Sequence, residues 1–176
     1  LISNHHQPED NKVEIIAGRN KVFALHMFDQ SMVGKVDNVS YDLMEIIAEA
    51  KVHLVGKEMN ANSMTYFLSG SSDNLNQLLY KAEKRYPNAS ISGKMVALIS
   101  AIGANINTNQ ALARGMHALA ELNVNPMAAH SSMRNVNVQF VVEDSDYNSA
   151  ICALHEALIS EKTRQSAANA KPVKAA

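Results

Sequence analysis

Cysteine is nearly absent from this sequence, since Cys152 is the only one among 176 residues. A single thiol excludes an intrachain disulfide framework and a metal site built from several thiolates. Tryptophan is missing and aromatic residues make up 5% of the chain, which argues against an aromatic platform for carbohydrates. These shortages predict small aliphatic cores and a reducing environment, so we expect a cytoplasmic location.

An excess of charge of one sign is also lacking, because 16 Lys and Arg are balanced by 17 Asp and Glu, giving a net charge of -1. Without a basic patch, neither nucleic acid nor an anionic membrane is an expected partner. The first ten residues lack the basic and apolar blocks of a signal peptide, and no apolar run approaches membrane-spanning length.

Catalytic and metal-binding motifs are missing as well. The sequence has no GxxxxGK[ST] phosphate loop, and its seven histidines are scattered without HExxH spacing or a cysteine partner. We therefore expect no catalytic residue, no metal and no cofactor in this chain.

What the sequence does contain is an internal repeat with a shift of 73 residues. The identical pairs share one register without a gap, and they include Lys21 with Lys94, Ala24 with Ala97, Leu25 with Leu98, Asn62 with Asn135, Phe67 with Phe140, Ser72 with Ser145 and Asp73 with Asp146. A duplicated structural unit explains this register better than chance does.

Each copy has the same hydrophobic pattern. A run that is apolar on both faces, at 22–28 and again at 95–101, predicts a buried strand. A helical period follows, then two strands (52–57 and 64–68, then 127–131 and 136–142), then a second helix. The pattern predicts an α+β fold of two ferredoxin-like βαββαβ units, with antiparallel sheets and helices on one face.

The closing strand differs between the copies. Residues 89–94 can close the first copy, but residues 161–176 are polar and rich in Ala and Lys, which predicts a disordered tail. The segment at 13–17, which precedes the first copy, is a further predicted strand that neither copy accounts for. We therefore expect it to complete the second unit, so that the first unit is inserted within the second. The expected boundaries are 20–94 for the first domain, 13–19 plus 95–160 for the second, and 1–12 for a linker.

Several stretches resemble the tandem ACT region at the C-terminus of aspartate kinases. MVALISAIGAN at 95–105 is similar to the opening strand and effector loop of the second ACT repeat, and ALAELNVN at 118–125 is similar to the helix end that follows. Residues 130–142 and 147–158 resemble the last strand and helix. VEIIAGRNKVFAL and FDQSMVG resemble the subgroup associated with ectoine synthesis. The resemblance covers 13–159, and it makes 1–12 the link from a kinase lobe.

The resemblance implies a parent enzyme that phosphorylates the side-chain carboxylate of aspartate with ATP, on the way to lysine, threonine and methionine or to ectoine. ATP and Mg would bind in the kinase domain, outside these 176 residues. It also implies a homodimer formed through the ACT repeats, an amino-acid effector such as lysine or threonine, and contact with the chain's own kinase domain. A stand-alone ACT sensor or dimerisation module without kinase activity stays open as the alternative.

The resemblance places the effector in the loop between the first strand and the first helix. An α-amino acid needs backbone N–H groups for its carboxylate and an acidic group for its ammonium. In the first copy this loop consists of Asp29, Gln30, Ser31, Met32, Val33 and Gly34, whereas Ile102 replaces the acid in the second copy. We expect the loop at Asp29 to be the better site, with Asn105 and Ile106 of the second copy serving the partner face.

Simpler interpretations of these residues stay open. Asp29 is equally consistent with a solvated turn residue, and Gly34 with turn geometry alone. Lysine-inhibited members of the family carry an acid early in the second strand, where this chain has Val55. Effector binding is therefore expected, but lysine as the effector is in doubt.

Overall fold

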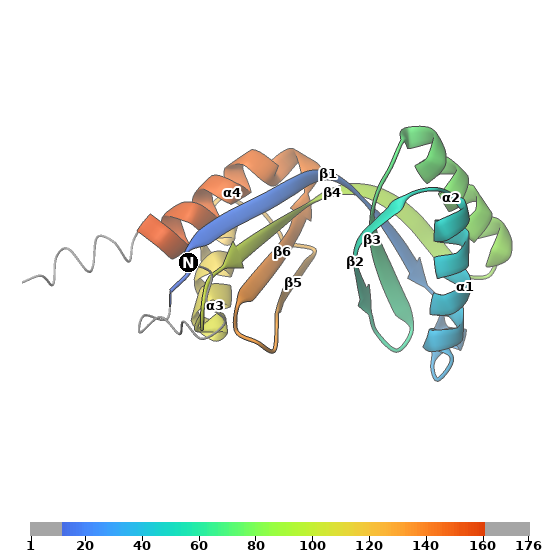
Figure 1. Cartoon of the computed structure of the whole chain (residues 1–176), viewed down its shortest axis with the longest axis horizontal. Helices are drawn as coiled ribbons and strands as arrows, with labels where there is room; N and C mark the ends of the chain where they lie inside the picture. Colours follow the sequence, from blue (N-terminus) through green and yellow to red (C-terminus); the bar gives the residue numbers. More distant parts are fainter. Residues whose placement is uncertain (1–11, 161–176) are drawn as a thin grey trace, which may run out of the picture. The chain divides into compact units, whose positions relative to one another are not determined.

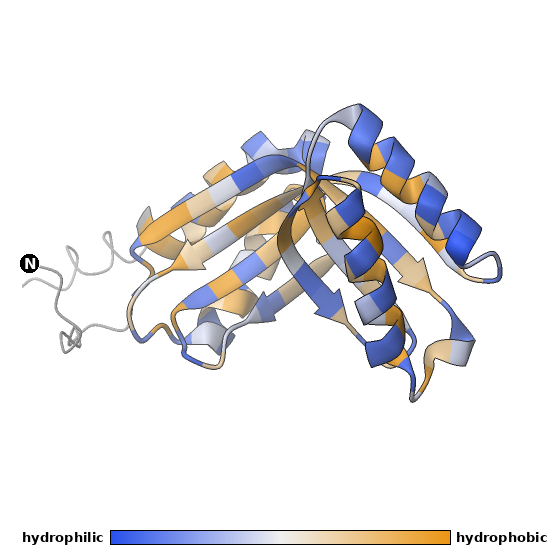
Figure 2. Cartoon of the chain, turned by 45° about the vertical axis from the view of Figure 1, so that its right-hand side comes forward, coloured by the Kyte–Doolittle hydropathy of each residue, from blue (hydrophilic) through white to orange (hydrophobic). Residues whose placement is uncertain are grey.

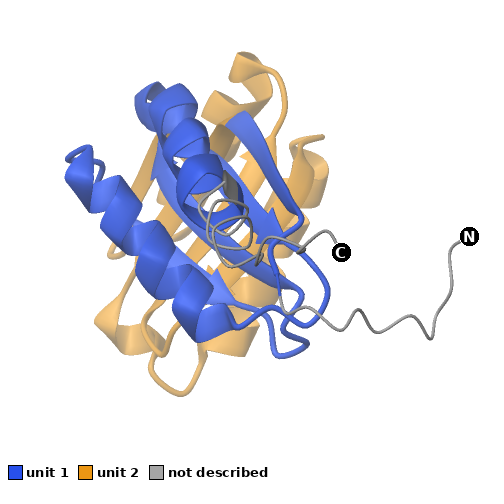
Figure 3. Cartoon of the chain, turned by 90° about the vertical axis from the view of Figure 1, so that its left-hand side faces the viewer, with its two compact units in different colours: residues 1–20, 97–176 blue, residues 21–96 orange. Residues whose placement is uncertain are grey.

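The computed structural model describes residues 12–160, which fold as two compact units. Unit 2 comprises 21–96, and unit 1 comprises the described residues up to 20 and from 97 onward (Figure 3). The linker expected at 1–12, apart from Lys12, and the tail expected at 161–176 lie outside the described residues. No helix within 12–160 is long and apolar enough to cross a bilayer.

The elements follow one another in the predicted order (Figure 1). They are β1 (Ile15–Phe28), η1 (Gln30–Met32), α1 (Val36–Glu49), β2 (His53–Met59), β3 (Ser63–Ser69), α2 (Ser72–Arg85), β4 (Ser90–Ile102), α3 (Thr108–Glu121), β5 (Ala128–Ser131), β6 (Asn137–Glu143), η2 (Asp144–Asp146), α4 (Tyr147–His155) and η3 (Glu156–Ser160). The strand order is β2-β3-β1-β4 in unit 2 and β1-β4-β6-β5 in unit 1, with antiparallel pairing in β1–β3, β2–β3 and β5–β6. The predicted α+β fold, with the first repeat inserted in the second, is confirmed.

The core of unit 2 forms because β1 alternates and the helices carry apolar stripes. Phe23, Leu25 and Met27 point from β1 into the same buried cluster as Leu43 of α1 and Leu78 of α2. Both helices mix apolar and polar positions in Figure 2, as expected for helices with one side on a sheet. The sheet of unit 2 is thereby covered on one face by α1 and α2.

The core of unit 1 repeats this arrangement with a borrowed strand. Ile99 of β4, Leu119 of α3, Phe140 of β6 and Leu154 of α4 are buried in one cluster, which Val13 joins from the chain's beginning. The amide of Glu14 donates to the carbonyl of Ile102 at 2.8 Å, extending the pairing of the first strand with β4. The segment at 13–17 is therefore an integral part of the C-terminal unit.

Two features differ from the sequence pattern. The runs at 13–17 and 22–28 were expected as separate strands, and so were those at 89–94 and 95–101, but each pair is one continuous strand, β1 and β4. The sequence predicts Ser72 or Asp73 as the cap of α2, but the cap is Ser71, whose side chain accepts from the amide of Asn74. Asp146 at the start of α4 accepts no side-chain cap bond.

Candidate functional site

The loop expected to bind an effector lies in unit 2, between β1 and α1. It opens at Asp29, makes the short helix η1, and reaches α1 through Gly34 and Lys35. Gln30, Ser31 and Val33 are exposed, so these three positions are open to solvent and to a ligand. Met32 is 2% exposed and belongs to the core of unit 2, so its side chain anchors the loop.

The side chain of Asp29 is held at the start of this loop by a hydrogen bond to the backbone two residues further on. Its Oδ1 accepts from the amide of Ser31 at 2.7 Å, which makes Asp29 the N-cap of η1. This amide, together with the Ser31 hydroxyl, lowers the pKa of the Asp29 carboxyl below its ordinary value of 3.8. The side chain is therefore an ionised, fixed carboxylate, the group that an ammonium ion requires.

The far end of the loop has the opposite character. Helix α1 begins after Lys35, which makes no side-chain cap bond to the helix. Uncapped N–H groups and the helix dipole favour a negative group at such an end, where Asp37 already places one carboxylate in the first turn of α1. Gly34 has φ +77, a conformation that by itself favours glycine, and nothing lies within 4 Å of where its Cβ would be. A ligand can thus approach the backbone here without a steric barrier.

Val55 lies in β2, the edge strand of unit 2. The β2–β3 register shifts between Leu54 and Gly56, so Val55 sits at a bulge, where it is half-buried. It offers no charge to a ligand, and no hydrogen bond connects it to the Asp29 loop. The structure therefore places Val55 in the same unit as the loop without bringing it into the loop's bonding network.

The corresponding loop in unit 1 is closed by its own side chains. Asn107 caps α3, because its Oδ1 accepts from the amide of Gln110 at 3.1 Å. Ile106 is 4% exposed and packs in the core of unit 1, while Asn105 is exposed with φ 53. The two loops thus differ chemically: one has a fixed carboxylate and an uncapped helix, the other an occupied cap and no acid.

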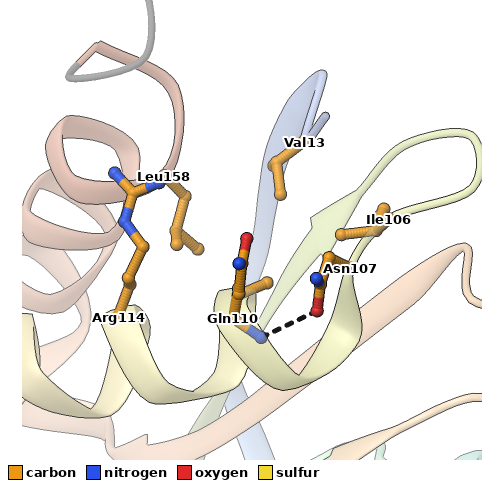
Figure 4. Close-up of a pocket in the computed structure, with 7 residues that line it drawn as sticks. Val13, Ile106, Asn107, Gln110, Arg114 and Leu158 are labelled. Atoms are coloured by element: carbon orange, nitrogen blue, oxygen red, sulfur yellow. Dashed lines mark hydrogen bonds between the residues drawn. The ribbon is translucent and has the colours of Figure 1, made fainter. Parts of the chain in front are cut away.

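A small cavity lies beside this second loop (Figure 4). It is lined by Val13, Ile106, Asn107, Gln110, Ala111, Arg114 and Leu158. Its volume is about 10 Å³, room for about one water molecule. Arg114 donates to the carbonyl of Ala157, which ties α3 to the C-terminal turn of unit 1. An amino acid does not fit this cavity in the present conformation.

The sequence analysis missed the residue that holds each loop in place. In unit 2 the amide of Asp29 donates to the carbonyl of Asn62 at 3.0 Å, and Asn62 Nδ2 donates to Gln30 Oε1 at 3.3 Å. In unit 1 the amide of Ile106 donates to the carbonyl of Asn135 at 2.7 Å. Asn62 and Asn135 are an identical pair of the 73-residue repeat, and that was the available signal.

Comparisons with known proteins agree with this architecture, although no family model matches the chain. Over 161 residues, 90% of this chain, the sequence is 40% identical to aspartate kinase Ask_Ect of Stutzerimonas stutzeri strain A1501. The chain spans 33% of the length of that relative. Among solved structures, the regulatory subunit of aspartate kinase from Thermus flavus superposes with a TM-score of 0.66 at 14% identity, covering 83% of this chain and 98% of that one.

The chain resembles the regulatory regions of aspartate kinases in sequence and in fold. A further structural relative, aspartate kinase of Clostridium acetobutylicum, superposes with a TM-score of 0.75 at 17% identity over 88% of this ACT region and 36% of that chain. At such identities the structures support the fold alone. The chain therefore matches nearly the whole fold of one separate regulatory subunit and about a third of a longer aspartate kinase chain.

Proposed function

We propose that this ACT region is the regulatory part of an enzyme that phosphorylates L-aspartate with ATP. The observation that carries the proposal is the 40% identity to an aspartate kinase over 90% of the chain, joined to a fold that matches isolated regulatory subunits. ATP and Mg would bind outside the ACT region, in the part of the enzyme that makes up the remaining length of the relative. The pathway, toward lysine, threonine, methionine or ectoine, belongs to the same proposal.

A stand-alone ACT sensor without kinase activity is the second candidate. The comparisons favour the kinase, because the curated relative is an aspartate kinase and not a separate sensor. Co-expression of the ACT region with its native upstream coding sequence tests this directly. Aspartate-dependent ATP consumption by the product supports the kinase, and its absence supports the sensor.

The effector proposed for this region is an amino acid bound at the loop from Asp29 to Gly34. Its ammonium would bind the carboxylate of Asp29, and its carboxylate would bind the uncapped start of α1 beyond Lys35. Lysine and threonine are the leading candidates from the family. The neutral Val55 offers no partner for a second ammonium, which argues against lysine. Asn105, which is exposed, would contribute from the second loop of a partner chain, whereas Ile106, whose side chain is buried, would contribute only through its backbone.

Titration calorimetry of the chain against lysine, threonine and methionine tests this site. One of the three should bind, and Asp29→Ala should weaken it by about ten-fold or more, because a charge-assisted hydrogen bond is lost. Asp144→Ala is the matched control, since Asp144 lies outside both loops. Equal losses in the two variants would remove Asp29 from the site, and no binding of any of the three would contradict amino-acid sensing.

A homodimer is proposed as the assembly, in the cytoplasm. Its support is that β2 ends the strand order of unit 2 and β5 ends that of unit 1. Such edges present unpaired backbone groups that favour pairing with a second chain. Light scattering should give twice the chain mass of 19.2 kDa. A monomer at working concentration would contradict the dimer.

A further inference from the structure

The same hydrogen-bonding device recurs at both loops of the ACT region. In each unit a hairpin asparagine, Asn62 or Asn135, accepts from a loop amide through its backbone carbonyl. Its side chain also bonds a nearby side chain in each unit, on η1 in unit 2 and on the first residue of α3 in unit 1. Asn62 Nδ2 donates to Gln30 Oε1 at 3.3 Å, and Thr108 Oγ1 donates to Asn135 Oδ1 at 3.5 Å.

The recurrence is informative because the loops themselves have diverged. Under the shift of 73 residues Asp29 corresponds to Ile102 and Gln30 to Gly103, whereas Asn135 bonds Ile106 and Thr108. The asparagine is thus present in both copies although it bonds different positions of the two loops. The hairpin does not need this side chain for its own closure. In unit 2 the turn is closed by Asn60, whose amide donates to the carbonyl of Ser63 at 2.8 Å and whose Nδ2 donates to Ser63 Oγ at 3.5 Å.

We propose that Asn62 is a positioning residue for effector binding, acting through Gln30 and not by touching the ligand. Its carbonyl fixes the amide of Asp29 and its side chain fixes Gln30, so the first two loop residues are held from the β2–β3 hairpin. The carboxylate of Asp29 is held from the other side by the amide of Ser31. A loop whose first residues are held in place loses less conformational entropy when a ligand binds, which raises affinity.

The proposal rests on the proposed effector site, and the experiment separates the two. Calorimetry measures the affinity of the wild-type chain, of Asn62→Ala and of Asn60→Ala for lysine, threonine and methionine. Asn62→Ala should lower the affinity for the bound amino acid roughly three- to ten-fold, the contribution of one hydrogen bond. Asn60→Ala is the matched control, because its side chain bonds only within the same hairpin. Its affinity should equal that of the wild type.

A double-mutant cycle identifies the route of the effect. In a Gln30→Ala background, Asn62→Ala should cause no further loss, since the contact it removes is already gone. Thermal denaturation of the same variants supplies the readout for a purely structural role. If Asn62→Ala and Asn60→Ala lower the melting temperature alike and leave affinity unchanged, the positioning role is overturned. If the wild-type chain binds none of the amino acids, the effector site fails, and the positioning role fails with it.

Unit 2 is the appropriate place for this test. Asn135 has φ 53, so an alanine there would strain the backbone as well as remove the side chain. Asn62 is not among the positive-φ residues of the described chain, which leaves its side chain as the only group that the substitution changes.

Discussion

Gly115 in α3 gives a prediction in which two known effects oppose each other. Replacing a helix-interior glycine by alanine usually stabilises a protein by about 1 kcal/mol. Here the added Cβ would lie 2.4 Å from Cζ of Phe140 and 3.0 Å from Cδ2 of Leu154. Both neighbours are fully buried in the core of unit 1, so neither ring nor methyl can swing into solvent.

The steric effect should exceed the propensity gain. Favourable carbon–carbon contact begins at about 3.5 Å, so the Phe140 ring must move by roughly 1 Å against a close-packed core. Overpacking of this kind costs about 1–3 kcal/mol. Because a 2.4 Å contact is severe, the cost should lie in the upper part of that range, about 2–3 kcal/mol. After the gain of about 1 kcal/mol from helix propensity, Gly115→Ala should destabilise unit 1 by about 1–2 kcal/mol.

Urea denaturation followed by far-ultraviolet circular dichroism measures the effect, since the chain has no tryptophan. Ala113→Gly, at an exposed position of the same helix, measures the propensity contribution alone and should cost about 1 kcal/mol. Phe140→Leu should relieve the clash, so in the double variant Gly115→Ala should become less harmful by about 0.5–3 kcal/mol. A Gly115→Ala chain as stable as the wild type, or more stable, would refute the steric reasoning.

Three further predictions concern residues of unit 2, one of which is compared with a residue that follows α3 in unit 1. Lys51 follows the C-cap of α1 and has φ 54, so Lys51→Gly should raise the free energy of unfolding by about 1 kcal/mol. Asn123→Gly, at φ 56 after α3, should raise it less because asparagine tolerates this region, and denaturation midpoints compare the two variants. Tyr66→Phe should lower the free energy of unfolding by about 1–3 kcal/mol, because it removes the 2.8 Å hydrogen bond between the Tyr66 hydroxyl and the buried Ser40 hydroxyl. Adding Ser40→Ala should restore part of that free energy in the same assay. The carboxyl of Asp29 should titrate below 3.8 by carbon-detected NMR. Because its pKa is lowered in the folded state, its contribution to stability is present above pH 3.8 and is lost as the pH falls through the folded pKa. An unshifted titration would contradict the cap bond.

The repeat and the fold class were predictable because they depend on local patterns. Alternation in the strands, helical periods and the 73-residue register are all visible without coordinates. The missing last strand of the second copy even predicted that the chain's beginning would supply it. The prediction of two separate strands at 13–17 and 22–28 was wrong, because both belong to the continuous strand β1. Gly18, Arg19 and Asn20, which lie between them, have the composition of a turn, but pairing with neighbouring strands overrides this weak local preference.

The candidate site was predictable only in outline. The sequence by itself determined that the loop from Asp29 to Gly34 carries an acid and a glycine, and that the second copy lacks the acid. Tertiary structure alone decided that the side chains of Met32 and Ile106 are buried in the two cores, where they anchor their loops. It also decided that Asn62, more than 30 residues along the chain, holds Gln30. The physical reason is that periodicity is set by near neighbours in the chain, whereas burial and hydrogen bonding between distant segments exist only once those segments have packed together.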